Sequence, residues 1–211
     1  MSNQNLVILS VEQVRVLGCL MEKHLATPNN YPLTPNGITL ACNQKSNRFP
    51  VMQLDEGKVL NNAQQLKELG LVSIEYGERI NKYSHRAPGF FCVTREQQAV
   101  LAMLMLREPL TISDLKARTE KMIGFESIEG VQEVVNELEA SEPALIIKLP
   151  VAAGQREERY THLLAGEPDL SAIPVKESKA SGTSQAQKIA ELEARIEILE
   201  AALDLKYQVD D

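Results

Sequence analysis

Two segments of the sequence repeat one pattern of residue types 77 positions apart, and this repeat limits how the chain can fold. Residues 81–86 read NKYSHR and residues 158–163 read ERYTHL, so a basic residue, a tyrosine, a hydroxyl residue and a histidine recur in order. Upstream of each, LTPNGITLACN (33–43) and LTISDLKARTE (110–120) both begin with Leu-Thr and continue in a helical pattern. Self-similarity in the same order predicts two copies of one structural unit.

The first copy is predicted to contain three helices followed by a β-hairpin. Ser10 and Gln13 have the spacing of a capping box, and apolar residues then recur at helical intervals. Thr34 is expected to cap a second, short helix that has proline at its first position. A third helix is predicted over residues 55–69, with Gly70 as its C-cap. The hairpin strands are LVSIEY (71–76) and NKYSHR (81–86).

The second copy repeats this order of elements. Thr94, Thr111 and Ser127 are expected to cap its three helices, and ALIIKLP and ERYTHLL supply its hairpin. Three helices and a hairpin, with a short second helix, form the winged helix-turn-helix arrangement. The sequence therefore predicts an α+β, mainly helical fold with two tandem winged helix-turn-helix domains, residues 1–92 and 93–166. The tyrosine of each returning strand is expected to pack against the helices.

The last 45 residues are predicted to form a linker and a coiled-coil helix. Residues 167–186 are rich in Pro, Gly, Ser and charge, as flexible linkers are. In residues 187–211, apolar side chains alternate by 3 and 4, as in the a and d positions of a parallel two-stranded coiled coil. A helix that packs back on its own domain is the alternative. The candidate dimerisation residues are Ile189, Leu192, Ile196, Leu199 and Leu203.

Composition favours a packed cytoplasmic protein with no membrane partner. Hydrophobic residues make up 44% of the chain, but no apolar run approaches the length of a membrane-spanning helix. The N-terminus lacks the basic and apolar regions of a signal peptide. Three cysteines without CxxC spacing are typical of a reduced compartment.

No catalytic or cofactor motif is recognisable. HExxH, GxxxxGK, GxSxG and paired CxxC are absent from the sequence. His85 and His162 occupy equivalent positions of the repeat, which indicates an inherited structural role. A Cys–His nucleophile is not excluded, but nothing singles one out. We therefore expect no enzyme activity, no metal and no cofactor.

Charge leaves only the first domain suited to duplex DNA. The net charge is +2 over residues 1–92, −4 over residues 93–166 and −5 over residues 167–211, for a total of −7. A winged helix places its third helix in the major groove and its hairpin on the flanking backbone. Asn and Gln on that helix can read adenine edges, and cations can contact phosphate. The candidate DNA-contacting residues are Lys45, Arg48, Lys58, Asn61, Asn62, Gln65, Arg79 and Lys82.

Each part of this DNA interface also has a purely structural interpretation. The Asn and Gln side chains can form an ordinary solvated helix face, and Asp55 and Glu56 at the start of the helix would repel phosphate. The loop NQKSNR can build a turn through its own side chains, with Arg48 paired to Asp55 or Glu56.

The second domain is predicted to dock proteins or to dimerise. Its third helix carries four carboxylates and no cation, which disfavours a phosphate backbone. The leading hypothesis is thus a DNA-binding or transcription-associated homodimer that acts through the first domain. The alternative is a protein-interaction scaffold in which neither winged helix binds DNA. The carboxylates are Glu129, Glu133, Glu137 and Glu139.

Four segments and the heptad-bearing tail carry a resemblance to a known family. The segments are YPLTPNGITLACNQKSNRFPVM, RVLGCLMEKHLATP, NKYSHR and RYTHLLAGE. They closely resemble the YceH-like family of uncharacterised bacterial proteins. The resemblance covers roughly residues 10–167 and implies tandem winged-helix domains, but it transfers no activity. The chain departs from the family at Phe49, where the family pattern has an acidic residue before the proline. An ion pair of Arg48 with that position is therefore not available.

Overall fold

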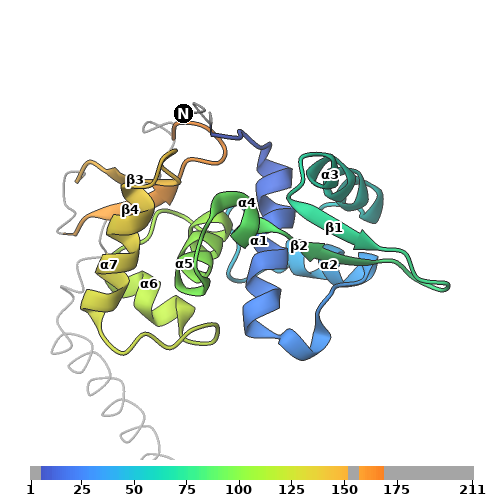
Figure 1. Ribbon diagram of the computed structural model, residues 1–211, viewed down its shortest axis with the longest axis horizontal. Helices are drawn as coiled ribbons and strands as arrows, with labels where there is room; N and C mark the ends of the chain where they lie inside the picture. The colour runs from blue at the N-terminus through green and yellow to red at the C-terminus, as the bar shows by residue number, and fades with distance from the viewer. Residues whose placement is uncertain (1–5, 152–156, 169–211) are drawn as a thin grey trace, which may run out of the picture. The chain divides into compact units, whose positions relative to one another are not determined.

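Two successive sets of helices, each closed by a hairpin, make up the part of the chain that the computed structural model describes, residues 6–151 and 157–168 (Figure 1). The fold is α+β, with about half of the described residues in helices and two small antiparallel sheets. The elements of the first set are α1 (Val11–Ala26), α2 (Pro35–Cys42), α3 (Glu56–Glu68), β1 (Val72–Glu75) and β2 (Lys82–His85). Those of the second are α5 (Arg95–Leu106), α6 (Ile112–Thr119), α7 (Ile128–Glu139), β3 (Ile146–Leu149) and β4 (Arg159–His162).

The helices begin where the sequence predicts. Ser10 and Gln13 form the capping box of α1, and Thr94 and Gln97 form that of α5. The hydroxyl of Thr34 accepts a hydrogen bond from the backbone N–H of Gly37 at the start of α2. These bonds satisfy N–H groups that a helix cannot pair internally. Two short helices were not predicted, the 3-10 helix η1 (Pro28–Asn30) and α4 (Ala87–Phe91).

The two hairpins have equivalent registers. Val72 pairs with His85 in the first, and Ile146 pairs with His162 in the second. A third segment joins each hairpin by an isolated bridge, Leu33 to Tyr83 and Leu110 to Tyr160. Both bridges keep the offset of 77 residues. The two tyrosines are buried, which confirms that they pack toward the helices.

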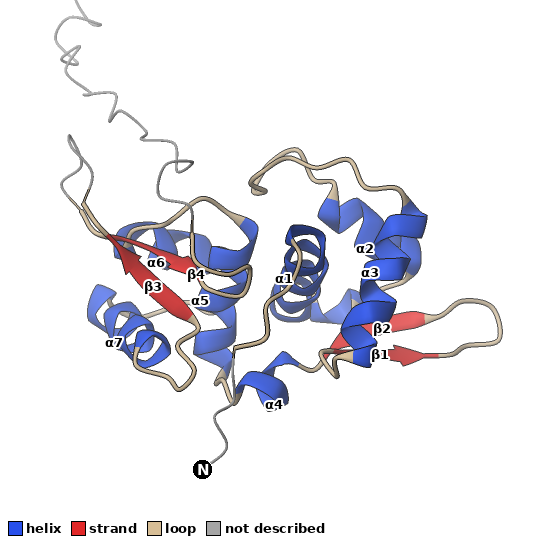
Figure 2. Ribbon diagram, turned by 90° about the horizontal axis from the view of Figure 1, so that it is seen from above, coloured by secondary structure: helices blue, strands red, loops and turns tan. Residues whose placement is uncertain are grey.

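The two halves share one hydrophobic core, with α1 and α5 side by side between them (Figures 1 and 2). All residues from 14 to 21 of α1 and from 98 to 106 of α5 are buried, because these stretches face their own half on one side and the other half on the opposite side. A Cβ on Gly18 would lie 3.1 Å from the Leu106 side chain, so glycine permits the close approach of the two helices. The expected division at residue 92 falls between α4 and α5.

Polar groups also cross between the halves. The side-chain amide of Gln98 on α5 donates a hydrogen bond to the Met21 carbonyl on α1 and lies 3.3 Å from His85 Nε2. His85 Nε2 is in turn 3.0 Å from His24 Nδ1. The Leu9 N–H donates to the Leu164 carbonyl at 2.7 Å. These bonds tie the first half to the second at several points along the shared core.

The predicted coiled-coil residues 187–211 lie outside the described residues, as does most of the predicted linker.

Candidate nucleic-acid interface

Helix α3 carries the residues that the sequence analysis selects for base contact. Val59, Ala63 and Leu66 are its buried face, so the helix presents its polar side to solvent. Lys58 and Asn61 are exposed on that side. The periodicity of 3.6 residues thus produces the amphipathic helix that the sequence predicts.

Two of the selected amides on α3 already have partners. Asn62 is half-buried and its side chain donates to the Lys58 carbonyl at 2.8 Å. Gln65 accepts a hydrogen bond from the Gln13 side chain of α1, also at 2.8 Å. Asn61 has neither restriction. The Asn62 side chain is therefore bonded to its own helix backbone. Gln65 would have to break its hydrogen bond with Gln13 before it could contact a base.

The N-terminal end of α3 is acidic. Asp55 caps the helix by accepting the Lys58 N–H at 2.8 Å, and Glu56 follows in the first turn. Lys58 Nζ lies 4.0 Å from the Asp55 carboxylate, with both side chains about two-thirds exposed. Such an exposed pair is weak, so Lys58 remains available to other anions.

The first hairpin, whose strand β1 packs against α3, carries two exposed cations. Lys82 lies on β2 and Arg79 in the turn that joins the strands. The end of α3 contacts the start of this turn, because Lys67 Nζ donates to the Tyr76 hydroxyl at 2.9 Å. Helix and hairpin are thereby joined at this point, and the hairpin carries the cations while the helix carries the amides.

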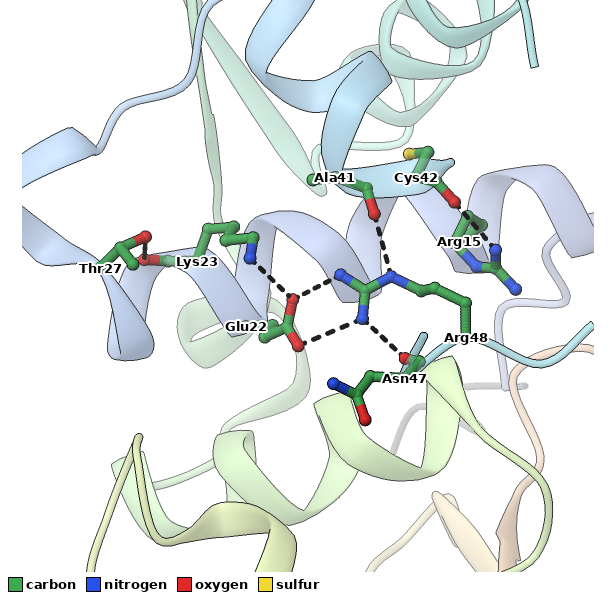
Figure 3. A network of polar contacts seen from close by, with 8 residues as sticks. All are labelled: Arg15, Glu22, Lys23, Thr27, Ala41, Cys42, Asn47 and Arg48. Carbon is green, nitrogen blue, oxygen red and sulfur yellow. Dashed lines mark hydrogen bonds and ion pairs between the residues drawn. The ribbon is translucent and has the colours of Figure 1, made fainter. Parts of the chain in front are cut away.

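Arg48 is not part of that surface. Its side chain is 0% exposed and its guanidinium donates to both carboxylate oxygens of Glu22, at 3.2 and 2.6 Å. It also donates to the carbonyls of Ala41 and Asn47 (Figure 3). The expectation that Arg48 contacts phosphate is therefore corrected. Its ion pair is formed with Glu22 of α1, and the expectation of Asp55 or Glu56 as partner is wrong.

A second buried arginine holds the same loop from the other end. Arg15, 1% exposed on α1, donates to the Cys42 carbonyl at 3.0 Å and to the Pro50 carbonyl at 2.6 Å. Asn43 closes the loop further by exchanging two hydrogen bonds with the backbone of Leu54. The segment ACNQKSNRFP thus owes its fixed shape mainly to two arginines that bond backbone carbonyls. Asn43 is the one Asn, Gln or Ser side chain of this loop that bonds to the backbone of a described residue.

Lys45 lies at the exposed tip of this loop. The bonds made by Arg15, Arg48 and Asn43 position the loop without using the Lys45 side chain. Arg15 and Glu22 were not among the candidate residues predicted from the sequence. The available signal was a single arginine inside the otherwise apolar stretch VRVLGCLM, where an unpaired charge would be costly.

The exposed face of α7 in the second half is acidic. Glu129, Glu133 and Glu137 are exposed, and Glu137 accepts a hydrogen bond from Gln97 at 2.8 Å. Lys148 on β3 pairs with Glu158 at 3.0 Å. This helix carries no cation and is poorly suited to lie against a phosphate backbone.

Within residues 6–151 and 157–168, no three His, Cys, Asp or Glu side chains are grouped to hold a metal ion. The same residues contain no helix that is both long and apolar enough to cross a bilayer.

Sequence comparisons give the family of the chain. A family model described as "Protein of unknown function, DUF480" matches residues 9–155. A UPF0502 protein of Xanthomonas campestris is 41% identical over 197 residues, which cover 93% of this chain and 88% of the relative. A UPF0502 protein of Geobacter sulfurreducens is 40% identical over 209 residues, covering 96% and 95%. The chain belongs to the DUF480 (UPF0502) family of uncharacterised bacterial proteins, which confirms its resemblance to the YceH-like proteins.

Proposed function

We propose that the two halves are tandem winged-helix domains and that the first binds duplex DNA in a transcription-associated role. The order of elements supports the winged-helix assignment, because each half has three helices, a bridge to a third segment and a hairpin. The observation that carries the DNA proposal is the pairing of an amide-bearing α3 with two exposed cations on the adjacent hairpin. The proposed activity is binding, without a catalytic step.

In this proposal α3 enters the major groove and the hairpin lies on the flanking backbone. Asn61 is the residue best placed to read a base edge, because its side chain is exposed and, unlike Asn62 and Gln65, is not used in a hydrogen bond among the described residues. The exposed cations available to phosphate are Lys45, Lys58, Arg79 and Lys82. Asp55 and Glu56 limit how deeply the first turn of α3 can approach the backbone.

The experiment is fluorescence anisotropy with labelled random-sequence duplex DNA. The variant Arg79→Glu/Lys82→Glu should bind at least about tenfold more weakly than the unaltered chain, since two phosphate contacts become repulsive. Lys148→Glu, on the equivalent hairpin of the second half, is the matched control and should retain binding. Equal binding by both variants and the unaltered chain would exclude the first hairpin from the interface.

Arg48→Glu is unsuitable for this experiment. The substitution would place a second carboxylate against Glu22 in a buried site, so any loss of binding would follow from loss of structure. Lys45→Glu by itself is the clean test of the loop, because Lys45 is exposed.

A second candidate function is a protein-interaction scaffold. The exposed carboxylates of α7 favour it, since they suit a basic protein surface better than nucleic acid. Absence of DNA binding at low salt, together with an intact fold, would favour this candidate over the first.

We also propose a homodimer formed through residues 187–211, on the basis of the heptad spacing alone. Leu192→Asp/Leu199→Asp should convert the dimer to a monomer in analytical ultracentrifugation. A monomer for the unaltered chain at tens of micromolar would contradict the proposal.

A further inference from the structure

A cavity of about 540 Å³ lies where the end of α1, the loop that follows α2, and α6 come together. Its volume is within the range of sites that hold small organic ligands. The cavity belongs to both halves of the fold, and the loop that borders it is the one fixed by Arg15 and Arg48. It is distinct from the polar face of α3.

Four cations from three segments line this cavity. Lys23 comes from α1, Lys45 from the loop, Arg118 from the end of α6 and Lys121 from the turn that follows it. Among the described residues, no carboxylate forms an ion pair with Lys45, Arg118 or Lys121. Glu22 also borders the cavity, but its carboxylate is shared between Arg48 and Lys23, which leaves Lys45, Arg118 and Lys121 without a counter-ion in the part of the chain that the structure describes. Positive charge in the cavity is therefore largely uncompensated.

Arg107, which lies outside the cavity lining, is also affected by the positive charge of Arg118. Burial, and next the repulsion from Arg118, lower the pKa of Arg107 to about 10, while Glu22 partly offsets the effect. The Arg107 Nε is also buried without a hydrogen-bond partner among the described residues. An anion in the cavity would relieve this repulsion.

The cavity has an apolar side as well. Met103 of α5 and Met122, just after α6, are nearly fully buried and line it. Methionine side chains adapt to flat or irregular apolar groups. Gln44 and Ser46 add hydrogen-bonding groups at the loop. The lining thus combines a cationic rim with an apolar wall, as a ligand with a charged end and an apolar body requires.

We propose that this cavity binds a small organic phosphate of about nucleotide size. Its phosphate groups contact Lys45, Arg118 and Lys121, and its apolar or planar part rests on the side lined by Ala26, Met103 and Met122. A phosphate group carries more charge and more acceptor oxygens than a single carboxylate, which suits several cations that converge from separate segments. The site shares Lys45 with the proposed DNA interface, whereas Arg118 and Lys121 belong to the cavity alone.

The test is isothermal titration calorimetry of the full chain with ADP, pyrophosphate and adenosine. ADP should bind, pyrophosphate should bind more weakly because it lacks the apolar body, and adenosine should not bind measurably. Arg118→Glu/Lys121→Glu should weaken ADP binding at least about tenfold, since two contacts become repulsive. Both side chains are exposed, so the melting temperature should be retained.

Arg79→Glu/Lys82→Glu is the control, because these cations lie on the first hairpin. It should leave ADP binding unchanged even where it abolishes DNA binding. The proposal would be overturned if neither ADP nor pyrophosphate bound at millimolar concentration. It would also be overturned if the Arg118→Glu/Lys121→Glu variant bound ADP as tightly as the unaltered chain does. A third such result is that this variant loses DNA binding while the unaltered chain does not bind ADP. The last result would assign the cations to a nucleic-acid surface.

Discussion

The guanidinium of Arg48 faces the carboxylate of Glu22 in a two-pronged ion pair between the loop after α2 and α1 (Figure 3). The arginine side chain is 0% exposed and the glutamate side chain 12% exposed. Because water reaches this pair poorly, the loss of one partner leaves a buried charge uncompensated. The pair therefore fixes the loop that carries Lys45, and it links the stability of the fold to the shape of both proposed binding surfaces.

Glu22→Gln should lower the free energy of unfolding by about 3 kcal/mol, since the Arg48 charge stays buried without its counter-ion. The measurement is urea denaturation at neutral pH. Glu12→Gln, an exposed position on the same helix, is the control and should change stability by less than about 0.5 kcal/mol. A loss below about 1 kcal/mol for Glu22→Gln would place the pair in the class of surface ion pairs.

Gly18→Leu should destabilise the protein by about 1–3 kcal/mol, because the added side chain would force α1 and α5 apart. A Cβ at this position already lies 3.1 Å from Leu106 and 3.2 Å from Met105. Gly89→Ala is the control, since a Cβ there meets nothing within 4 Å. Thermal unfolding of both variants measures the difference. An unchanged melting temperature for Gly18→Leu would show that the helices do not pack this closely.

The two histidines of the repeat should make stability depend on pH. Burial, helped by nearby His24, lowers the pKa of His85 from 6.5 to about 4, and burial alone does the same to His162. The unfolded chain then binds more protons than the folded chain between pH 6.5 and about 4. These two histidines therefore leave the free energy of unfolding unchanged above pH 6.5, and they lower it as the pH falls from 6.5 toward 4.

The measurement is the free energy of unfolding in urea at several pH values between 7 and 4.5. Each histidine that titrates in this way contributes a slope of up to about 1.4 kcal/mol per pH unit. His85→Gln and His162→Gln should each reduce the slope, whatever they do to stability at pH 7. A variant with the same slope as the unaltered chain would mean that its histidine is not held neutral by burial.

Much of the fold was predictable because short-range chemistry determines its elements. The capping boxes at Ser10 and Thr94 and the alternation around Tyr83 and Tyr160 depend on residues within a few positions of one another. The repeat of 77 residues then supplied the second half from the first. The close packing of α1 on α5 was not predicted, because an all-round apolar helix does not identify its second partner.

The candidate site was less predictable because it depends on contacts between distant segments. Arg48 and Lys45 are both cations of one polar loop, and no local pattern tells which is buried. Glu22 lies 26 residues away from Arg48, and Gln13 lies 52 residues away from Gln65. Such pairs cannot be predicted from the local sequence, because they depend on how the helices pack in three dimensions.

The most direct test of the proposed DNA binding is its salt dependence, measured by anisotropy with random-sequence duplex DNA between about 50 and 200 mM monovalent salt. Four phosphate contacts, from Lys45, Lys58, Arg79 and Lys82, predict a log–log slope of about −3 to −4. Arg79→Gln/Lys82→Gln should reduce the slope to about −2. Absence of binding at the lowest salt, or a slope that this variant leaves unchanged, would contradict DNA binding by the first half.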